Sequence, residues 1–363
     1  MHPVDFELSD DQVALQDAAR DLLDALAGHD QRRAHLTSGE PFDHALFSAM
    51  VEQGWLGIAL SEEKGGIGLG WVEAAVLLEQ IGAHAAPVPF LPSLLALTVL
   101  DRSDNAPESW ITALVNGERT GCVAWSKNAD ALSSTSDGAA WTISGRIGVL
   151  EGATHADIAV VTTRDGVFGV ELTSSTRPQR ESAMDETRGL SWLEFDKTSA
   201  LRLGGAELAE TLLNHGAVGA SAEMLGGTNQ VMDISVQYAK DRVQFGQPIG
   251  SFQAIKHRCA DMVVDVEGMR SATWYAAWAL SVGDSEASLA ASTAKVWSSD
   301  ASKRVMASGL QVHGGIGFTW EHDLHLYMKR AQFDQLSYGT ASFHRERVAL
   351  LLRSQLASGA GVF

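Results

Sequence analysis

The stretch Gln237-Tyr-Ala-Lys-Asp-Arg-Val-Gln-Phe-Gly-Gln-Pro-Ile-Gly-Ser-Phe-Gln-Ala-Ile-Lys256 carries the strongest indication of fold and function in this chain. Its pattern predicts the end of one helix, then a turn carrying Gly246, Pro248 and Gly250. A second helix follows, with Ser251 as its expected cap. Such a turn gathers a guanidinium, a ring, two amides and free backbone N–H groups, which suit a phosphate-bearing cofactor. Taken by itself, the segment is better explained as a polar turn between helices with a buried phenylalanine.

A second motif lies downstream, in Gln311-Val-His-Gly-Gly-Ile-Gly-Phe318. The two motifs, in this order, resemble those of the acyl-CoA dehydrogenase family. In that family an Arg-x-x-Phe-Gly turn, followed by a Gln in the next helix, reaches across a dimer interface to the partner's FAD. A Gln-x-x-Gly-Gly-x-Gly loop touches the same cofactor. The resemblance therefore implies FAD as cofactor and an acyl-CoA as substrate, with electrons usually passing to an electron-transfer flavoprotein.

The composition limits the classes of partner. The 363 residues are 45% apolar and 20% charged, which allows two or three packed units with sizeable cores. The net charge of −18 repels nucleic acid and anionic membrane surfaces, so we expect neither as a partner. Two cysteines, Cys122 and Cys259, are too few for a disulfide framework and favour a cytoplasmic location. Residues 1–8 lack the features of a signal peptide, and the histidines show no metal-binding spacing.

Hydrophobic patterning changes twice along the chain. A capping box at Ser9-Asp-Asp-Gln12 opens an amphipathic helix that closes at Gly28. Runs rich in β-branched and aromatic residues then predict strands, with Arg164-Asp-Gly166 as a hairpin turn. The predicted strands cover 121–125, 139–149, 158–163 and 167–172. Later patterns predict long antiparallel helices over 208–240, 252–282, 285–308 and 344–356.

These patterns indicate an α+β fold with three domains. We expect an N-terminal helical domain over 1–116, a small antiparallel β domain over 117–205 and a C-terminal helical bundle over 206–363. This order is similar to the acyl-CoA dehydrogenase fold along essentially the whole chain, although the β domain is shorter than the family's usual one.

The family's catalytic base is missing from both of its usual positions. A carboxylate must take the α-proton of the thioester, and an apolar pocket raises its pKa enough to do so. In the family this base is a Glu just before Gly-Thr, where this chain has Tyr338, a weak base at neutral pH. Some members place it earlier, where this chain has Gly216 followed by Ala217. Glu223 is the nearby alternative, although a helical Glu paired with a neighbour explains it better.

The segment that resembles the family's flavin-contacting strand also departs from the pattern. Aligned without gaps on 145–157, it has Val149 in place of the ring that packs on the flavin. Glu151 replaces the Thr that donates to the flavin, and a carboxylate there opposes the negative charge of the reduced cofactor. We therefore expect the chain's own flavin site to be degenerate.

By contrast, the residues that the resemblance places across a dimer interface are present. Arg242 would pair with pyrophosphate oxygens, and Gln253 and Gln311 would bond the adenosine half. Glycines in the second motif would allow close backbone approach. The full expected set of cofactor contacts is Arg242, Gln244, Phe245, Phe252, Gln253, Gln311, Val312, His313, Gly314, Gly315, Thr340 and Ser342.

This asymmetry favours a partner subunit that completes the FAD site of a longer catalytic chain. The sequence resembles the shorter subunits of actinobacterial α2β2 steroid-CoA dehydrogenases, which implies a heterotetramer. Two alternatives remain open from the residues. One is a self-sufficient homo-oligomeric dehydrogenase with a displaced base, Glu223. The other is a flavin-free scaffold on the same fold, which the retention of Arg242, Gln253 and Gln311 argues against.

Overall fold

A computed structural model describes residues 8–128, 130–138 and 140–358. Two parts of the sequence predictions lie outside these ranges. One is Ala139, the first residue of a predicted strand, and the other is most of the N-terminal segment considered for a signal peptide. The chain divides into two compact units, each described by itself below. The first unit comprises residues 1–29, 75–86 and 217–363, and the second comprises residues 30–74 and 87–216.

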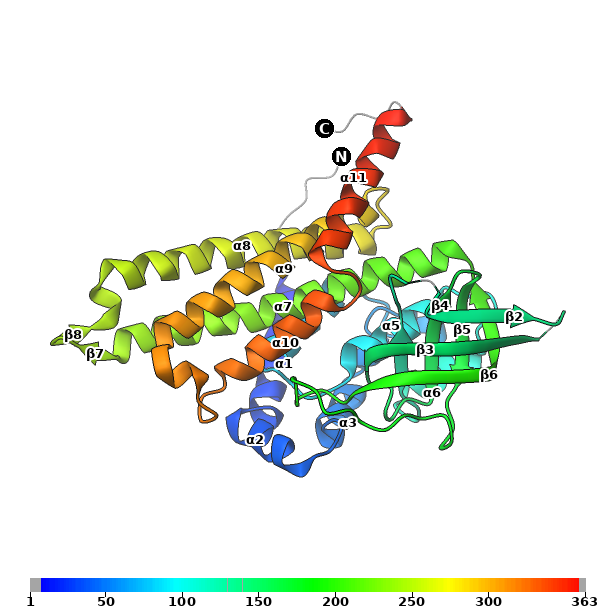
Figure 1. Ribbon diagram of the computed structural model, residues 1–363, viewed down its shortest axis with the longest axis horizontal. Helices are drawn as coiled ribbons and strands as arrows, with labels where there is room; N and C mark the ends of the chain where they lie inside the picture. The colour runs from blue at the N-terminus through cyan, green and yellow to red at the C-terminus, as the bar shows by residue number, and fades with distance from the viewer. Residues whose placement is uncertain (1–7, 129, 139, 359–363) are drawn as a thin grey trace. The chain divides into compact units, whose positions relative to one another are not determined.

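Helices dominate both ends of the chain (Figure 1). The first, α1, begins with the predicted capping box, in which Ser9 and Gln12 each accept a hydrogen bond from the other's backbone N–H. The N-terminal helices are α1 (Asp10–Leu26), α2 (His29–Ser38), α3 (His44–Glu52), α4 (Trp71–Ala83), α5 (Phe90–Asp101) and α6 (Glu108–Val115). Two short 3-10 helices, η1 (Trp55–Gly57) and η2 (Glu62–Lys64), interrupt the glycine-rich connection before α4.

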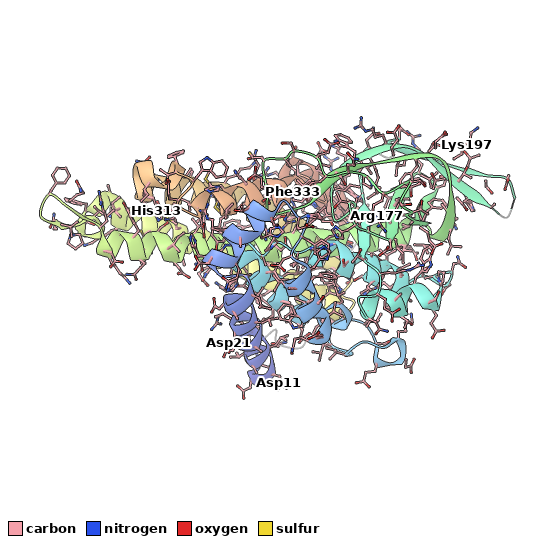
Figure 2. All side chains as sticks on the ribbon, turned by 90° about the horizontal axis from the view of Figure 1, so that it is seen from below. Asp11, Asp21, Arg177, Lys197, His313 and Phe333 are labelled. Atoms are coloured by element: carbon pink, nitrogen blue, oxygen red, sulfur yellow. The ribbon has the colours of Figure 1, made fainter. Side chains whose placement is uncertain are left out.

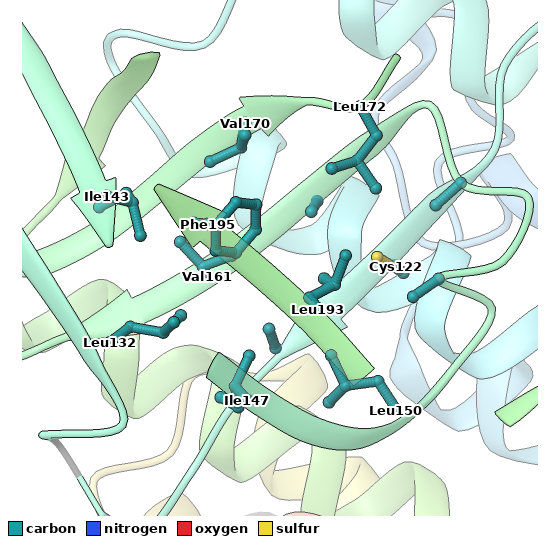
Figure 3. Close-up of a cluster of buried hydrophobic side chains, with 14 of the residues drawn as sticks. Cys122, Leu132, Ile143, Ile147, Leu150, Val161, Val170, Leu172, Leu193 and Phe195 are labelled. Atoms are coloured by element: carbon teal, nitrogen blue, oxygen red, sulfur yellow. The ribbon is translucent and has the colours of Figure 1, made fainter. Parts of the chain in front are cut away.

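The second unit holds a six-stranded sheet in the order β1-β4-β5-β6-β3-β2. Its strands are β1 (Gly121–Ala124), β2 (Leu132–Ser136), β3 (Trp141–Glu151), β4 (Ile158–Thr163), β5 (Gly166–Glu171) and β6 (Leu190–Gly204). The hairpin between β4 and β5 is confirmed, and its register ends at the pair Thr163 and Gly166. Side chains such as Ile143, Val161 and Phe195 converge in the core of this unit (Figure 3).

The expectation of a purely antiparallel sheet is wrong at one edge, because β1 pairs with β4 in parallel. Two strands were also not predicted. The β2 sequence Leu-Ser-Ser-Thr-Ser has only one buried position, so hydrophobic alternation gives almost no signal. The strand β6 alternates for part of its length but contains Lys197 at a positive φ of 47°, which breaks the pattern.

The C-terminal bundle belongs to the first unit from residue 217 onward. Its helices are α7 (Ala206–Asp241), α8 (Gln253–Ser281), α9 (Ala287–His313), α10 (Leu324–Leu336) and α11 (Ala341–Ala357). The helix α9 packs against α8, α10 and α11 (Figure 1). Its buried side chains join a core that includes Met224, Val266 and Val305. The patterns predicted four of these helices, whereas α10 was missed because its buried face includes Arg330, Asp334 and Gln335, which interrupt the apolar stripe.

The predicted cap of α8 is wrong. The N-cap of this helix is Phe252, and no side chain accepts a hydrogen bond from its first turn. The Ser251 hydroxyl instead donates to the carbonyl of Pro248 at 2.7 Å. Residues 249–251 form a short 3-10 helix, η3, so the chain enters α8 one residue later than the serine suggests.

Within the described residues, none of the helices combines the length and the apolar character needed to cross a membrane.

Candidate functional site

A small hairpin follows α7 and presents the first motif. Strands β7 (Val243–Gln244) and β8 (Gln247–Pro248) pair at the tip where α7 ends and α8 begins (Figure 1). Phe245 and Gly246 between them both have positive φ, 53° and 79°, as a two-residue type I′ turn requires. The backbone N–H of Ile249 donates to the carbonyl of Arg242 at 2.8 Å, closing the base of the hairpin.

The side chains of this hairpin are turned outward. The side chains of Arg242, Gln244 and Gln253 are exposed, and Phe245 is 91% exposed. The Phe245 ring meets Phe252 edge-to-face at 6.1 Å between centroids. Such exposure of a large aromatic ring is costly in water, so this surface is suited to binding a ligand or another subunit. The predicted polar turn therefore exists, but without the buried phenylalanine of its simpler interpretation.

The second motif forms the end of α9 and a 3-10 helix, η4 (Gly314–Phe318). Gly314 has a φ of 63°, a conformation that glycine adopts without strain. Gly314 and Gly315 are exposed, and a Cβ built on either would meet nothing within 4 Å. Their backbone is thus open to close approach by a ligand. Gln311 is exposed beside them, whereas the Val312 side chain is buried.

The buried side chain of His313 connects the two motifs. Its ring stacks on Tyr238, the residue one turn before Arg242, with centroids 4.6 Å apart and planes 26° from parallel. Its Nδ1 lies 2.8 Å from the carbonyl of Gly309, and burial lowers the pKa of the ring. His313, labelled in Figure 2, is 4% exposed. Sequence reasoning gave His313 only backbone contacts and did not identify Tyr238, because contact between two helix ends leaves no local signal.

A hydrogen-bonded turn carries the last predicted contacts. Tyr338 has a φ of 53°, and its carbonyl lies 2.8 Å from Nε2 of His344. The Nζ of Lys295, fully buried on α9, donates to the carbonyls of residues 334, 335 and 339 at 2.8, 3.2 and 3.1 Å. Thr340 then caps α11 by accepting from the N–H of residue 343, and Ser342 is exposed in the first turn of that helix.

The candidate base Glu223 lies deep in the helix packing. It is 2% exposed and has an interaction partner within the fold. A Cβ added to Gly82 of α4 would lie 2.1 Å from the Glu223 carbonyl, so the two helix backbones touch here. Eighteen residues of α7 separate Glu223 from Asp241, or about 27 Å of helix. The candidate base and the hairpin of the first motif are therefore far apart in one chain.

The strand β3 contains the second departure from the family pattern. An oxygen of Glu151 lies 2.5 Å from Nη1 of Arg188, and the two side chains are only 9% and 2% exposed. The sequence suggested that Glu151 is an isolated negative charge. In the structure it is paired with the cation of Arg188. Val149 is 44% exposed, and the ring of Trp192 in β6 covers the neighbouring Gly148.

These observations decide which residues fit a flavin. Glu151 has its carboxylate committed to Arg188 and no hydroxyl to donate, so β3 does not fit the family's flavin contact. The exposed guanidinium of Arg242, the amides beside it and the open glycine backbone do fit a pyrophosphate and its adenosine. The described residues hold no cluster of His, Cys, Asp and Glu suited to a metal ion.

Comparison with known proteins establishes the family. Models of the acyl-CoA dehydrogenase N-terminal and C-terminal domains match residues 9–118 and 204–352. Acyl-CoA dehydrogenase IpdE2 of Mycobacterium tuberculosis is 32% identical over 327 residues, covering 89% of this chain and 91% of its own length. The chain belongs to the acyl-CoA dehydrogenase family, oxidoreductases that act on CH–CH bonds.

Two solved structures share the fold of this chain. A chain of the ChsE4-ChsE5 complex from Mycobacterium tuberculosis is 27% identical, with a TM-score of 0.89 over 98% of this chain and 99% of that one. A chain of the Tcur3481-Tcur3483 steroid ACAD is 29% identical, also with a TM-score of 0.89, over 96% of this chain and 99% of that one. The predicted resemblance and the expected fold class are confirmed.

Proposed function

We propose that this chain is the partner subunit of a hetero-oligomeric acyl-CoA dehydrogenase and completes the FAD site of a longer catalytic chain. The proposal rests on a contrast between the two parts of the chain that could contact FAD, the outward-facing motifs and the strand β3. The donors of the hairpin and of the glycine loop face outward. The strand that should hold a flavin within the chain instead carries the buried Glu151–Arg188 pair.

The carboxylates of this chain support the same conclusion. The candidate base Glu223 is only 2% exposed within the helix packing. The positions usual for the base hold Gly216 and Tyr338, which supply no carboxylate. Proton abstraction therefore belongs to the sister chain in this proposal.

The roles of this chain's residues follow from their placement. Arg242 would bind pyrophosphate oxygens by charge-assisted hydrogen bonds, and Gln253 and Gln311 would donate to the adenosine half. Phe245 would cover the cofactor and exclude water. Bound FAD would supply the oxidant for α,β-desaturation of a CoA thioester. The proposed electron acceptor is an electron-transfer flavoprotein. The proposed location is the cytoplasm, which the two free cysteines, Cys122 and Cys259, support.

The substrate class is proposed from the relatives. One structural neighbour is named as a steroid ACAD. A second neighbour with the same TM-score, 0.89, comes from the ChsE4-ChsE5 complex. We therefore propose a steroid-derived acyl-CoA as substrate of the assembled enzyme. A homo-oligomeric dehydrogenase using Glu223 is the alternative, and it predicts flavin and activity in this chain alone.

The test replaces Arg242 with alanine in the complex formed with the catalytic chain. Loss of a charge-assisted hydrogen bond costs about 1.5–3 kcal/mol, so FAD affinity should fall roughly 10- to 150-fold. Flavin retained after dialysis measures the effect, and circular dichroism checks the fold. Lys256→Ala removes an exposed positive charge one turn into α8 and is the matched control, expected to retain FAD. Unchanged flavin occupancy in Arg242→Ala would show that the hairpin does not hold the cofactor.

A further inference from the structure

The last helix of the bundle, α11, is fully buried only near its beginning. Its buried side chains are Ala341 and His344. Close to its other end, the amide of Gln355 donates to a carboxylate oxygen of Glu286 at 3.4 Å. His344 and Gln355 are 11 residues apart, or about three turns, so they mark one side of α11 as the side that faces its own unit.

The opposite side of α11 is exposed along the helix. Glu346, Leu350, Arg353 and Ala357 follow one another at intervals of four, three and four residues, so they lie on one face. All four are exposed, and Leu350 at the centre is 61% exposed. We call these four residues the α11 face. One exposed leucine is ordinary on a protein surface, so the charges on either side of it decide what the face can bind.

The two charges of the α11 face have no partner in the described part of the chain. Glu346 has no basic residue, and Arg353 no acidic residue, three or four positions away along the helix. They are about 10 Å apart along the helix axis, too far to pair with each other. The neighbouring Arg345, by contrast, forms an ion pair with Asp300 of α9. Both charges of the face are therefore available to another molecule.

The α11 face is complementary to itself when it is read in the opposite direction. We consider two antiparallel copies of α11 related by a twofold axis that passes between residues 349 and 350. Glu346 of each copy then lies opposite Arg353 of the other, and Leu350 lies opposite the small, exposed Ala349. A parallel pair would instead place like charges opposite each other, which is repulsive. Twofold contacts between identical surfaces are the commonest kind in protein oligomers.

We propose that the α11 face is an interface between two copies of this chain, whose α11 helices pack antiparallel about Leu350. Two Glu346–Arg353 ion pairs, one on each side of the twofold axis, would set the register of the two helices. A second copy supplies the reversed pattern by symmetry, whereas any other partner would have to carry it independently. This interface does not depend on the role proposed for the chain toward FAD.

The proposal is tested by sedimentation equilibrium of the full chain. The α11 face spans only about three turns, so the contact is small and the dissociation constant should be on the order of 100 μM. We expect a reversible monomer–dimer equilibrium that weakens as salt is added. Leu350→Ser removes the apolar contact from both copies and should weaken association at least about tenfold. Leu336→Ser is the matched control, because Leu336 on α10 is 64% exposed but lies outside the face, and association should stay within about twofold of the wild type.

Charge reversal tests the pairing of the two side chains. Glu346→Arg and Arg353→Glu each turn both ion pairs of the dimer into repulsive contacts, so each variant should associate at least about tenfold more weakly than the wild type. In an equimolar mixture of the two variants, every such contact again joins opposite charges. The mixture should therefore associate about as strongly as the wild type, and a folding defect in either variant would not be reversed by mixing.

Three results would overturn the proposal. The first is a wild-type chain that stays monomeric up to about 500 μM, well above the expected dissociation constant. The second is a pair of charge variants that associate as the wild type does, or whose mixture is as weak as either variant alone. The third is a loss confined to the complex with a longer catalytic chain, which would show that the α11 face binds that chain and not a second copy.

Discussion

Replacing Lys295 with methionine tests how the turn at residues 338–340 is held. Methionine has nearly the same length and fills the same space, but it cannot donate to the carbonyls of residues 334, 335 and 339. At about 1 kcal/mol for each hydrogen bond, the free energy of unfolding should fall by about 2–3 kcal/mol at pH 7, because a neutral amine carries two N–H donors and an ammonium three. Urea denaturation followed by circular dichroism measures the loss.

The pH dependence of this loss follows from the pKa of Lys295. Burial lowers that pKa from 10.5 to about 7. Between these values the unfolded chain binds a proton that the folded chain does not, so the stability contributed by Lys295 rises with pH. The difference between the wild type and Lys295→Met should therefore grow by about 2 kcal/mol from pH 7.5 to pH 9.

Lys303→Met on the same helix is the control, because Lys303 is exposed and its loss should change the free energy of unfolding by less than about 0.5 kcal/mol. If Lys295→Met is as stable as this control, the turn does not depend on the buried amine. If the difference between the wild type and Lys295→Met is the same at both pH values, the amine does not titrate in this range.

Three further variants or conditions test other parts of the structure. Arg188→Met leaves the buried Glu151 without its cation and should lower the free energy of unfolding by about 3–5 kcal/mol, whereas adding Glu151→Leu should recover only part of it, because the buried Asp185 also loses its contact with Arg188; equal losses in both proteins would contradict a coupled pair. Burial lowers the pKa values of His155 and His215 to about 3, so stability should be lost as the pH falls below 6.5, with these two histidines accounting for roughly 4 kcal/mol at pH 5, and urea midpoints that do not change would be inconsistent with this. His313→Ala should lower the FAD affinity of the assembled complex about tenfold while His313→Phe preserves it, because a stacked ring keeps the two motifs together; equal flavin binding by the two variants would exclude that role.

Local patterns predicted much of the fold. The capping box at Ser9, the β4–β5 hairpin and the long helices of the bundle each depend on residues close in sequence, and each is present. The parallel pairing of β1 with β4 depends on residues 37 positions apart, such as Gly121 with Ile158, which hydrophobic alternation cannot reveal. The helix α10 was missed because its polar residues reduce the helical stripe.

The candidate site could be predicted in composition but not in geometry. The sequence identified Arg242 and the glycine loop, because a known family motif places them together. It could not show that Glu151 is neutralised by Arg188, which is 37 residues away. Nor could it show the stack of His313 on Tyr238, since the two residues lie at the ends of different helices. Pairings between distant side chains require the folded arrangement.

The central claim is that this chain completes a flavin site on another subunit and has no working flavin site of its own. The most direct measurement is the visible absorption spectrum of the chain purified alone, and again after co-expression with a longer acyl-CoA dehydrogenase chain encoded beside it. We predict a colourless protein alone and a yellow complex with about one flavin per heterodimer. Stoichiometric FAD in the lone chain, bleached on addition of an acyl-CoA, would contradict the claim and assign catalysis to this chain itself.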